Sequence, residues 1–436
     1  MVTPSLLVLL LLGTGGTVAF SQDMPPNALD GNRMFAATLQ NLIDTALRNN
    51  PGLTAADAKI EAASAGVAYT RSLDPPLAGV DFMESPIKFF PNLLKDQMEI
   101  DYFVQQMIPY PGKLSSMARV EQKRADMFRA DRKTQEQDIV RQIKMGYYEL
   151  YLLHRAMEIN NESQDLVRDF IEIARKQYEQ GMGNLADILR AQTELSSIVN
   201  DRVVLDQQQK STEGMLNALA SRPVTTGIGF IPEVVPPEEI PDLSELLAIA
   251  ETRRPELQSM QSNLEMQRAE RTVAGKEILP DIMIRGSYNQ IRGERDNWGL
   301  MLGLTVPLAP WSKQKYTAGK ERADANIRQA QAEIENMKNM VAQGVNDAFQ
   351  KVGSSRARII LTRDTTIPQA RETLESAIAA YQTGKGDFLM LIDIQRMLVM
   401  AELDYHMAVM NLLDSRSQLE RATGTTIEDM NGEPGR

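Results

Sequence analysis

The residue types that most often carry catalysis or bind metals are sparse in this sequence. Its 436 residues include no cysteine and only two histidines, which excludes thiol chemistry, disulfides and metal–thiolate sites. His154 and His406 lie in long helical patterns without a second ligand nearby, which favours packing over metal binding or proton transfer. The sequence contains no phosphate-binding glycine loop or nucleophile motif. We therefore expect no catalytic residue, no metal site and no cofactor.

Methionine is abundant, at 24 residues, and its thioether sulfur is a ligand for soft ions such as Cu(I) and Ag(I). Met397, Met400, Met407 and Met410 are spaced by three, seven and three residues within one helical pattern. This spacing places them on one helix face, where methionine commonly fills the seam between packed helices. The spacing favours packing, with a metal relay as the alternative.

The charge and the first residues indicate an exported protein. A net charge of −11 argues against nucleic acid as a partner, because phosphate binding needs a basic face. Residues 1–21 carry no charged side chain, and an apolar run at 6–12 is followed by Ala19 and Ser21 before a plausible cleavage site. This pattern predicts a signal peptide at 1–21, with a buried N-terminal helix as the alternative. No later stretch reaches the roughly 18 apolar residues of a membrane-spanning helix.

An internal repeat organises the rest of the chain. Pro51 and Pro255 lie 204 positions apart, each after a basic residue in a helical pattern. Further matches follow in order at offsets of 203 or 204: Pro76 with Pro280, Tyr178 with Tyr381, Gln192 with Gln395, and Leu195 with Leu398. We therefore predict two tandem repeats, at 22–222 and 242–424. A proline-rich linker at 223–241 joins them, and a polar tail at 425–436 follows.

A period-two pattern occurs once in each repeat, after two shorter helical patterns. Apolar residues alternate with glycine or more polar residues in the second repeat at Trp298, Leu300, Leu302, Leu304 and Val306. This alternation predicts a strand with one apolar face. It places one β-hairpin at about 77–109 and its counterpart at about 281–307. A soluble hairpin packed on helices is the alternative.

Long helical patterns follow each hairpin. Residues 112–180 contain no proline, which predicts a helix of roughly 100 Å at about 1.5 Å per residue. The second long pattern contains Pro368, which should kink it. Each long helix turns at a pair of glycines and returns, giving helical hairpins at 112–220 and 312–422. The fold class is therefore mainly α with a small β part, with long coiled-coil hairpins.

Four strands cannot close a barrel in a membrane, because an open edge would leave backbone groups unpaired in lipid. Bacterial barrels begin at about eight strands, so this chain must associate. Three copies would supply twelve strands. We expect a homotrimer in which the alternating strand of Trp298, Leu300, Leu302, Leu304 and Val306 faces lipid.

Duplicated motifs carry a resemblance to a known family. The helical turns read YQTGKGDFL at 381–389, followed by Asp393 and Gln395, with a sister motif at 178–192. The stretch QQMIPYPGKL at 105–114 is similar to the strand exit of members that accompany heavy-metal pumps. Over its mature length the chain resembles the TolC-like outer-membrane efflux proteins. The resemblance implies an outer-membrane trimer with a twelve-stranded β-barrel above an α-barrel that spans into the periplasm.

The resemblance also assigns partners and site residues. It implies docking onto a periplasmic adaptor protein and an inner-membrane transporter of the resistance-nodulation-division type. Carried over by position, the periplasmic gate is Asp187, Asp387 and Asp393, although a position acidic in some relatives is Met390 here. The adaptor-docking tips are Gly181, Gly183, Gly384 and Gly386. The alternative for the aspartates is that they cap the returning helices.

The expected function is a passive conduit of a tripartite efflux pump, for heavy-metal ions or drugs. The alternatives are an outer-membrane conduit for type I protein secretion and a periplasmic coiled-coil scaffold without a pore. The sequence assigns no substrate and no role to an apolar loop at 84–97.

Overall fold

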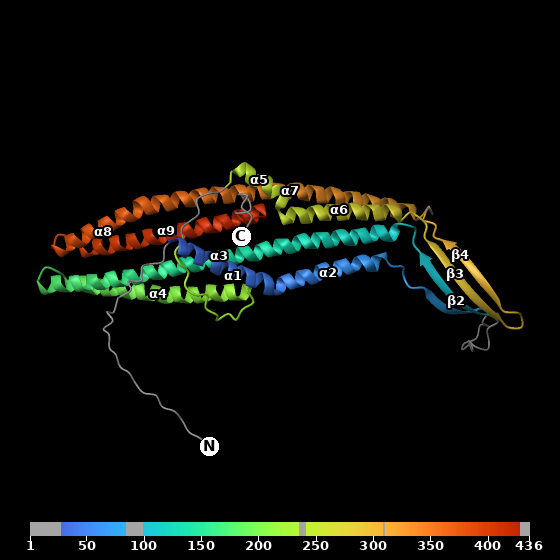
Figure 1. Ribbon diagram of the computed structural model, residues 1–436, viewed down its shortest axis with the longest axis horizontal. Coiled ribbons are helices and arrows are strands. Elements are labelled where there is room, and N and C mark those ends of the chain that lie inside the picture. Colours follow the sequence, from blue (N-terminus) through green and yellow to red (C-terminus); the bar gives the residue numbers. More distant parts are fainter. Residues whose placement is uncertain (1–27, 84–98, 235–240, 308–309, 428–436) are drawn as a thin grey trace, which may run out of the picture.

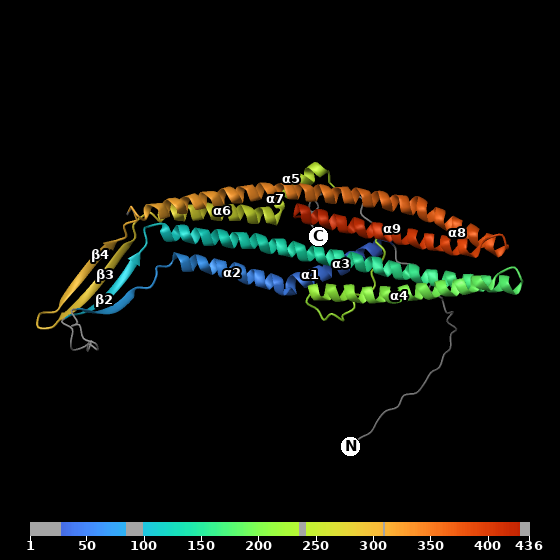
Figure 2. The ribbon, with the colours of Figure 1, turned by 180° about the vertical axis from the view of Figure 1, so that it is seen from behind.

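The computed structural model describes residues 28–83, 99–234, 241–307 and 310–427. These residues form a long rod, with a small sheet at one end and two helical turns at the other (Figures 1 and 2). The expected signal peptide at 1–21 and apolar loop at 84–97 lie outside the described residues.

The two halves of the chain contain the same elements in the same order. The first half consists of α1 (Ala28–Asn49), α2 (Pro51–Arg71), β1 (Leu77–Met83), β2 (Glu99–Ile108), α3 (Lys113–Glu179) and α4 (Leu185–Leu219). The second half consists of α5 (Leu243–Arg253), α6 (Pro255–Lys276), β3 (Ile282–Ile291), β4 (Asn297–Leu304), α7 (Lys313–Leu361), the π-helical turn η1 (Thr362–Thr366), α8 (Ile367–Gln382) and α9 (Phe388–Thr423). The predicted fold class and its tandem repeat are confirmed.

The matched prolines begin matched helices. Pro51 and Pro255 occupy the first position of α2 and α6, where the missing N–H would have no helical partner. In the first half Asn50 caps the helix, because its side-chain oxygen accepts a hydrogen bond from the Gly52 N–H at 2.8 Å. The repeated proline therefore divides two helices at the same point of each half.

The two long helices differ in continuity. Helix α3 runs unbroken for 67 residues, about 100 Å at about 1.5 Å per residue. Its counterpart is interrupted by η1, and Pro368 lies in the first turn of α8. Proline has no N–H to donate, and the wider π-helical turn accommodates the lost hydrogen bond. The second long helix is therefore interrupted at the position where the sequence predicts a kink.

The strands form one antiparallel sheet in the order β1-β2-β3-β4. The central pairing joins the two halves, with Ile108 opposite Ile282 and Glu99 opposite Ile291. Strand β4 ends at Leu304, so the prediction that Val306 is a strand residue is wrong. The Thr305 N–H still donates to the Asp281 carbonyl at 3.0 Å, but Pro307 cannot continue the ladder.

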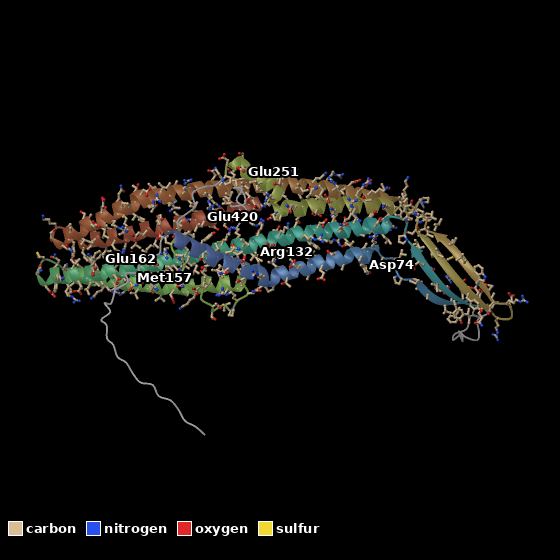
Figure 3. The ribbon with its side chains drawn as sticks, viewed as in Figure 1. Asp74, Arg132, Met157, Glu162, Glu251 and Glu420 are labelled. Atoms are coloured by element: carbon tan, nitrogen blue, oxygen red, sulfur yellow. The ribbon has the colours of Figure 1, made fainter. Side chains whose placement is uncertain are left out.

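The helices nearest the sheet lie side by side in the order α2, α3, α6 and α7, which repeats the order of the strands (Figures 1 and 2). Asp74, labelled in Figure 3, lies between α2 and the sheet, and its carbonyl accepts a hydrogen bond from Gln106 Nε2 at 2.9 Å. Farther from the sheet, α3 pairs with α4 and α8 pairs with α9. The protomer is thus a curved wall that continues into two helical hairpins.

The largest hydrophobic core lies near the middle of the rod. It is built around side chains of α3 that are fully buried, including Tyr147, Leu150 and Tyr151. Ion pairs beside this core join the two halves: Arg421 on α9 binds Asp138 on α3 at 2.7 Å, and within the second half it also binds Glu256 on α6. Lys144 on α3 binds Glu420 on α9 at 2.5 Å. The middle of the rod therefore holds the repeats in a fixed relation.

His406 should make the stability of this core depend on pH. Its Nδ1 lies 3.1 Å from the Tyr151 hydroxyl, and burial, followed by the charge of Arg155, lowers its pKa from 6.5 to about 4. The unfolded chain therefore binds more protons between these values, so stability is full above pH 6.5 and falls as the pH drops towards 4. Thermal unfolding followed by circular dichroism should show a midpoint several degrees lower at pH 5 than at pH 7.5. His406→Gln should reduce this difference; an equal difference in both proteins would contradict the assignment.

Candidate functional site

One face of the sheet is apolar, and no other described part of the chain covers it. The strand register aligns Val80, Tyr102, Tyr288 and Trp298 in one row across all four strands. All four side chains are exposed, Trp298 to 78%. Leu300, Leu302 and Leu304 continue this face along β4 and are also exposed. The residues predicted to alternate on one strand therefore share an exposed face, apart from Val306, which lies beyond β4.

The opposite face of the sheet mixes charged, polar and apolar side chains, and its charged groups crosslink the strands. Arg285 on β3 binds Asp81 on β1 at 2.6 Å and Asp101 on β2 at 2.7 Å. Its guanidinium lies 3.9 Å from the centre of the Phe103 ring, and Asp101 is only 4% exposed. One side chain therefore ties three strands together across the face that would meet water.

This arrangement suits a wall between lipid and water. Strands β2 and β3 each contain ten residues, close to the roughly 9–11 of a tilted membrane strand. An apolar outer face with a polar inner face is the pattern of outer-membrane strands. Among the described helices, none is both long and apolar enough to cross a membrane.

The two helical turns at the far end share one backbone geometry. Gly181 and Gly384 adopt φ values of 75° and 71°, the left-handed region that favours glycine. Gly183 and Gly386 lie where there is no room for a side chain. A Cβ added to Gly183 would lie 3.0 Å from the backbone nitrogen of Tyr178, and one added to Gly386 would lie 2.8 Å from the backbone nitrogen of Tyr381. In each motif the first glycine thus allows the turn, and the second allows the returning helix to approach.

The three aspartates predicted for the gate occupy different environments. Asp187, in the first turn of α4, accepts a hydrogen bond from the Tyr381 hydroxyl at 3.4 Å. Asp387 caps α9 by accepting a hydrogen bond from the Leu389 N–H at 3.3 Å. Asp393 is exposed one turn and a half further along α9. Asp387 therefore has the capping geometry that was the alternative, and Asp187 lies in a contact between hairpins.

Residues outside the predicted set connect the two hairpins near their tips. Arg396 on α9 binds both carboxylate oxygens of Glu194 on α4, with Nε 2.9 Å from Oε1. The hydroxyl of Tyr381 reaches Asp187, and burial, together with the Asp187 and Asp387 carboxylates, raises its pKa to about 12. Tyr381 belongs to the duplicated turn motif, which was its only sequence signal. These contacts hold the two hairpins together where a gate would open.

Three of the four methionines predicted to pack on α9 are exposed. Met397, Met400 and Met407 are 47%, 66% and 40% exposed, so the packing prediction is wrong for these side chains in the protomer. Met410 does pack against the central core. The buried seam of α9 consists instead of residues such as Leu391, Ile394, Ala401 and Ala408. Among the described residues, no group of three or more histidine, aspartate or glutamate side chains could hold a metal ion.

A sheet with a lipid-compatible face, carried on a long helical stalk, is an arrangement that suits an outer-membrane channel. A family model described as outer membrane efflux protein matches residues 42–221 and 246–425, in two segments that follow the two repeats. The chain belongs to this family. It is an outer-membrane protein that spans into the periplasm.

Individual relatives resemble the chain over most of its length. Outer membrane efflux protein BepC of Brucella suis biovar 1 (strain 1330) is 20% identical over 425 residues, covering 93% of this chain and 89% of BepC. The outer-membrane channel OprN superposes with a TM-score of 0.76 at 19% identity, covering 90% of this chain and 91% of OprN. CusC superposes with a TM-score of 0.75 at 17% identity, covering 89% of this chain and 92% of CusC. These structures share the fold.

The second glycine of the turn should be more sensitive to substitution than a glycine inside a helix. Gly386→Ala places a Cβ against the Tyr381 backbone nitrogen, whereas a Cβ at Gly344 in α7 meets nothing within 4 Å. We expect Gly386→Ala to lower the thermal midpoint by several degrees. The control Gly344→Ala should leave it unchanged or raise it, with about 0.5–1 kcal/mol of helix propensity gained. Equal midpoints for the two variants in a thermal melt would disprove the close-approach argument.

Proposed function

We propose that three copies of this chain form a closed channel with a twelve-stranded β-barrel in the outer membrane. The observation that carries the proposal is the sheet: its apolar face is uncovered, and β1 and β4 have no further strand partner in the described chain. Backbone groups at such edges must be paired in lipid, so β4 of one copy would pair with β1 of the next. The crystal structures of CusC are described as those of a protein that folds and forms a transmembrane channel, which supports this assembly.

The channel would act as a passive conduit of a tripartite efflux pump. Helix α3 is about 100 Å long at about 1.5 Å per residue, enough to carry the tunnel through much of the periplasm. We propose that the glycine turns at the far end dock onto a periplasmic adaptor and that an inner-membrane transporter of the resistance-nodulation-division type supplies the cargo. Heavy-metal ions or drugs are the proposed cargo classes, the first because of the strand-exit stretch at 105–114.

The aspartates near the tips would form the closed gate. A three-fold axis would bring three copies of Asp187 and Asp393 together, and rings of carboxylates narrow a pore and favour cations. The contacts of Tyr381 with Asp187 and of Arg396 with Glu194 would keep the hairpins in the closed position. Opening would require these contacts to break.

Neighbouring residues on β4 allow a matched test of the barrel. Leu302 lies on the apolar face and is 70% exposed, whereas Met301 lies on the opposite face. Leu302→Lys should abolish recovery from the outer-membrane fraction, because a lysine facing lipid costs roughly 2–4 kcal/mol per copy at mid-bilayer. Met301→Lys should still insert and form trimers by light scattering. If both variants insert equally, the assignment of the two faces is incorrect.

Removing the gate carboxylates should open the channel. We expect Asp187→Ala combined with Asp393→Ala to raise single-channel conductance in planar bilayers at least about twofold, because it removes the Tyr381 contact and a ring of charge. Asp404→Ala is the control, since Asp404 is exposed on the same helix farther from the turn. Unchanged conductance in the double variant would reject the gate. A monomeric protein without any conductance would favour a scaffold without a pore.

A further inference from the structure

A basic groove lies between α3 and α6, close to the end of the wall that carries the sheet. Its volume is about 540 Å³. Helix α3 contributes two serines and an arginine, and α6 contributes charged residues, a threonine and an alanine. The lining residues are Ser115, Ser116, Arg119, Glu265, Arg268, Ala269, Thr272 and Lys276. The groove is separate from the gate and from the lipid-facing side of the sheet.

The cations of this groove lack counter-charges. Neither Arg119 nor Arg268 has an ion pair or a side-chain hydrogen bond to the rest of the described chain, and both are exposed. Lys276 Nζ donates to the Gly112 carbonyl at 2.8 Å and to Ser116 Oγ at 2.7 Å, which are neutral groups. Glu265, the one lining carboxylate, is bound to Lys123 at 2.5 Å. Excess positive charge therefore remains in a chain whose net charge is −11.

The hydroxyl groups of the groove already donate their hydrogen bonds. Ser115 and Ser116 donate to the Gly112 carbonyl at 3.0 and 2.8 Å, and Thr272 donates to the Arg268 carbonyl at 3.1 Å. The donors left for a ligand are therefore the two guanidinium groups and the one N–H of Lys276 that makes neither of its two hydrogen bonds. A guanidinium offers a planar fork of N–H donors that matches the oxygens of phosphate or carboxylate.

The groove would stay open in an assembly of several copies. It lies between the two central helices of the wall formed by α2, α3, α6 and α7 (Figure 1). The strands follow the same order, so a neighbouring copy that pairs with β1 or β4 would meet the wall at α2 or α7. The α3–α6 groove is therefore not part of that seam.

In the proposed channel the groove would open on the side of the wall away from lipid. Met117 and Arg119 are two residues apart on α3, which places them about 200° apart around the helix. Met117 lines a different pocket, of mixed charged and apolar side chains, with Val306 and Trp311, just beyond the end of β4. Trp311 is 86% exposed, and exposed tryptophan near the end of a membrane strand is typical of the lipid interface. In the proposed channel Arg119, on the other side of α3, would therefore face the interior.

We propose that the α3–α6 groove binds a small anionic group, a phosphate or a carboxylate, on the tunnel side of the wall. The placement of the groove on the tunnel side rests on the proposed channel function. The anion site extends that function, because it adds anionic solutes to the cargo classes. Arg119 and Arg268 are the binding residues, and Lys276 adds charge at the end nearest the sheet. The same chemistry would suit a free anion in transit or the phosphate of a lipid headgroup.

Titration of the full-length, detergent-solubilised protein with inorganic phosphate at low salt tests the site. Calorimetry should show saturable binding, with a Kd at least about tenfold higher after Arg119→Gln combined with Arg268→Gln, because charge-assisted bonds are lost. Arg271→Gln is the matched control, since Arg271 lies on α6 but pairs with Asp324 at 3.1 Å. Wild-type affinity in the double variant, or no phosphate binding by the wild type, would overturn the proposal.

A second measurement separates the two sources of the anion. If a headgroup fills the groove, wild-type protein purified from phosphatidylglycerol nanodiscs should retain this lipid in native mass spectrometry, and phosphate should displace it. Binding of phosphate without retained lipid assigns the groove to free anions. In planar bilayers the double variant should become more cation-selective by reversal potential. A wild type that forms no pore but binds phosphate through these arginines would refute the channel and the tunnel placement, while leaving the anion site intact.

Discussion

The rest of this structure depends on one constraint: strand edges cannot remain unpaired in lipid. The chain places two hairpins side by side, with β2 of the first half against β3 of the second, and leaves β1 and β4 at the outside. A sheet this small cannot close on itself. In the proposed assembly other copies of the chain would pair with its two open edges, and this pairing would follow from backbone hydrogen bonding rather than from any single side chain.

The duplicated helices place the two functional ends at a fixed distance from each other. Each half has one long helix after its hairpin, and matched prolines at Pro51 and Pro255 divide the shorter helices beside it. The order of helices in the wall repeats the order of strands in the sheet. Ion pairs of Arg421 and Lys144 join the halves midway. The same helices therefore connect two ends of the rod that differ in chemistry: the sheet presents an apolar face, and the tips are polar.

Much of this fold was predictable because its elements appear in the sequence as regular spacings of apolar residues and of repeated motifs. Alternation from Trp298 to Leu304 predicted the strand and its apolar face, and the matches between the repeats located the weaker first hairpin. The contact of Arg396 with Glu194 was missed, because these residues lie 202 positions apart in the chain and the pattern of one helix does not depend on the other. The spacing of the methionines placed them on one face of α9, but it did not show whether another helix covers that face. Met400 was therefore expected to pack, whereas it is exposed. The alternation of apolar residues continues to Val306, but strand β4 ends at Leu304 because local hydrogen bonding and Pro307 end the ladder.

The bridge from Arg285 to Asp81 and Asp101 has a consequence for how the channel is assembled. It joins strands from both halves, so β1, β2 and β3 are held together before any other copy arrives. Each chain has three strand pairings already made, and in the proposed trimer it would need one new pairing per neighbour to close a ring. Closure would then be the docking of preformed sheets rather than the folding of separate strands. The slow step would be the meeting of copies, and its rate would rise with the concentration of the protein at the membrane.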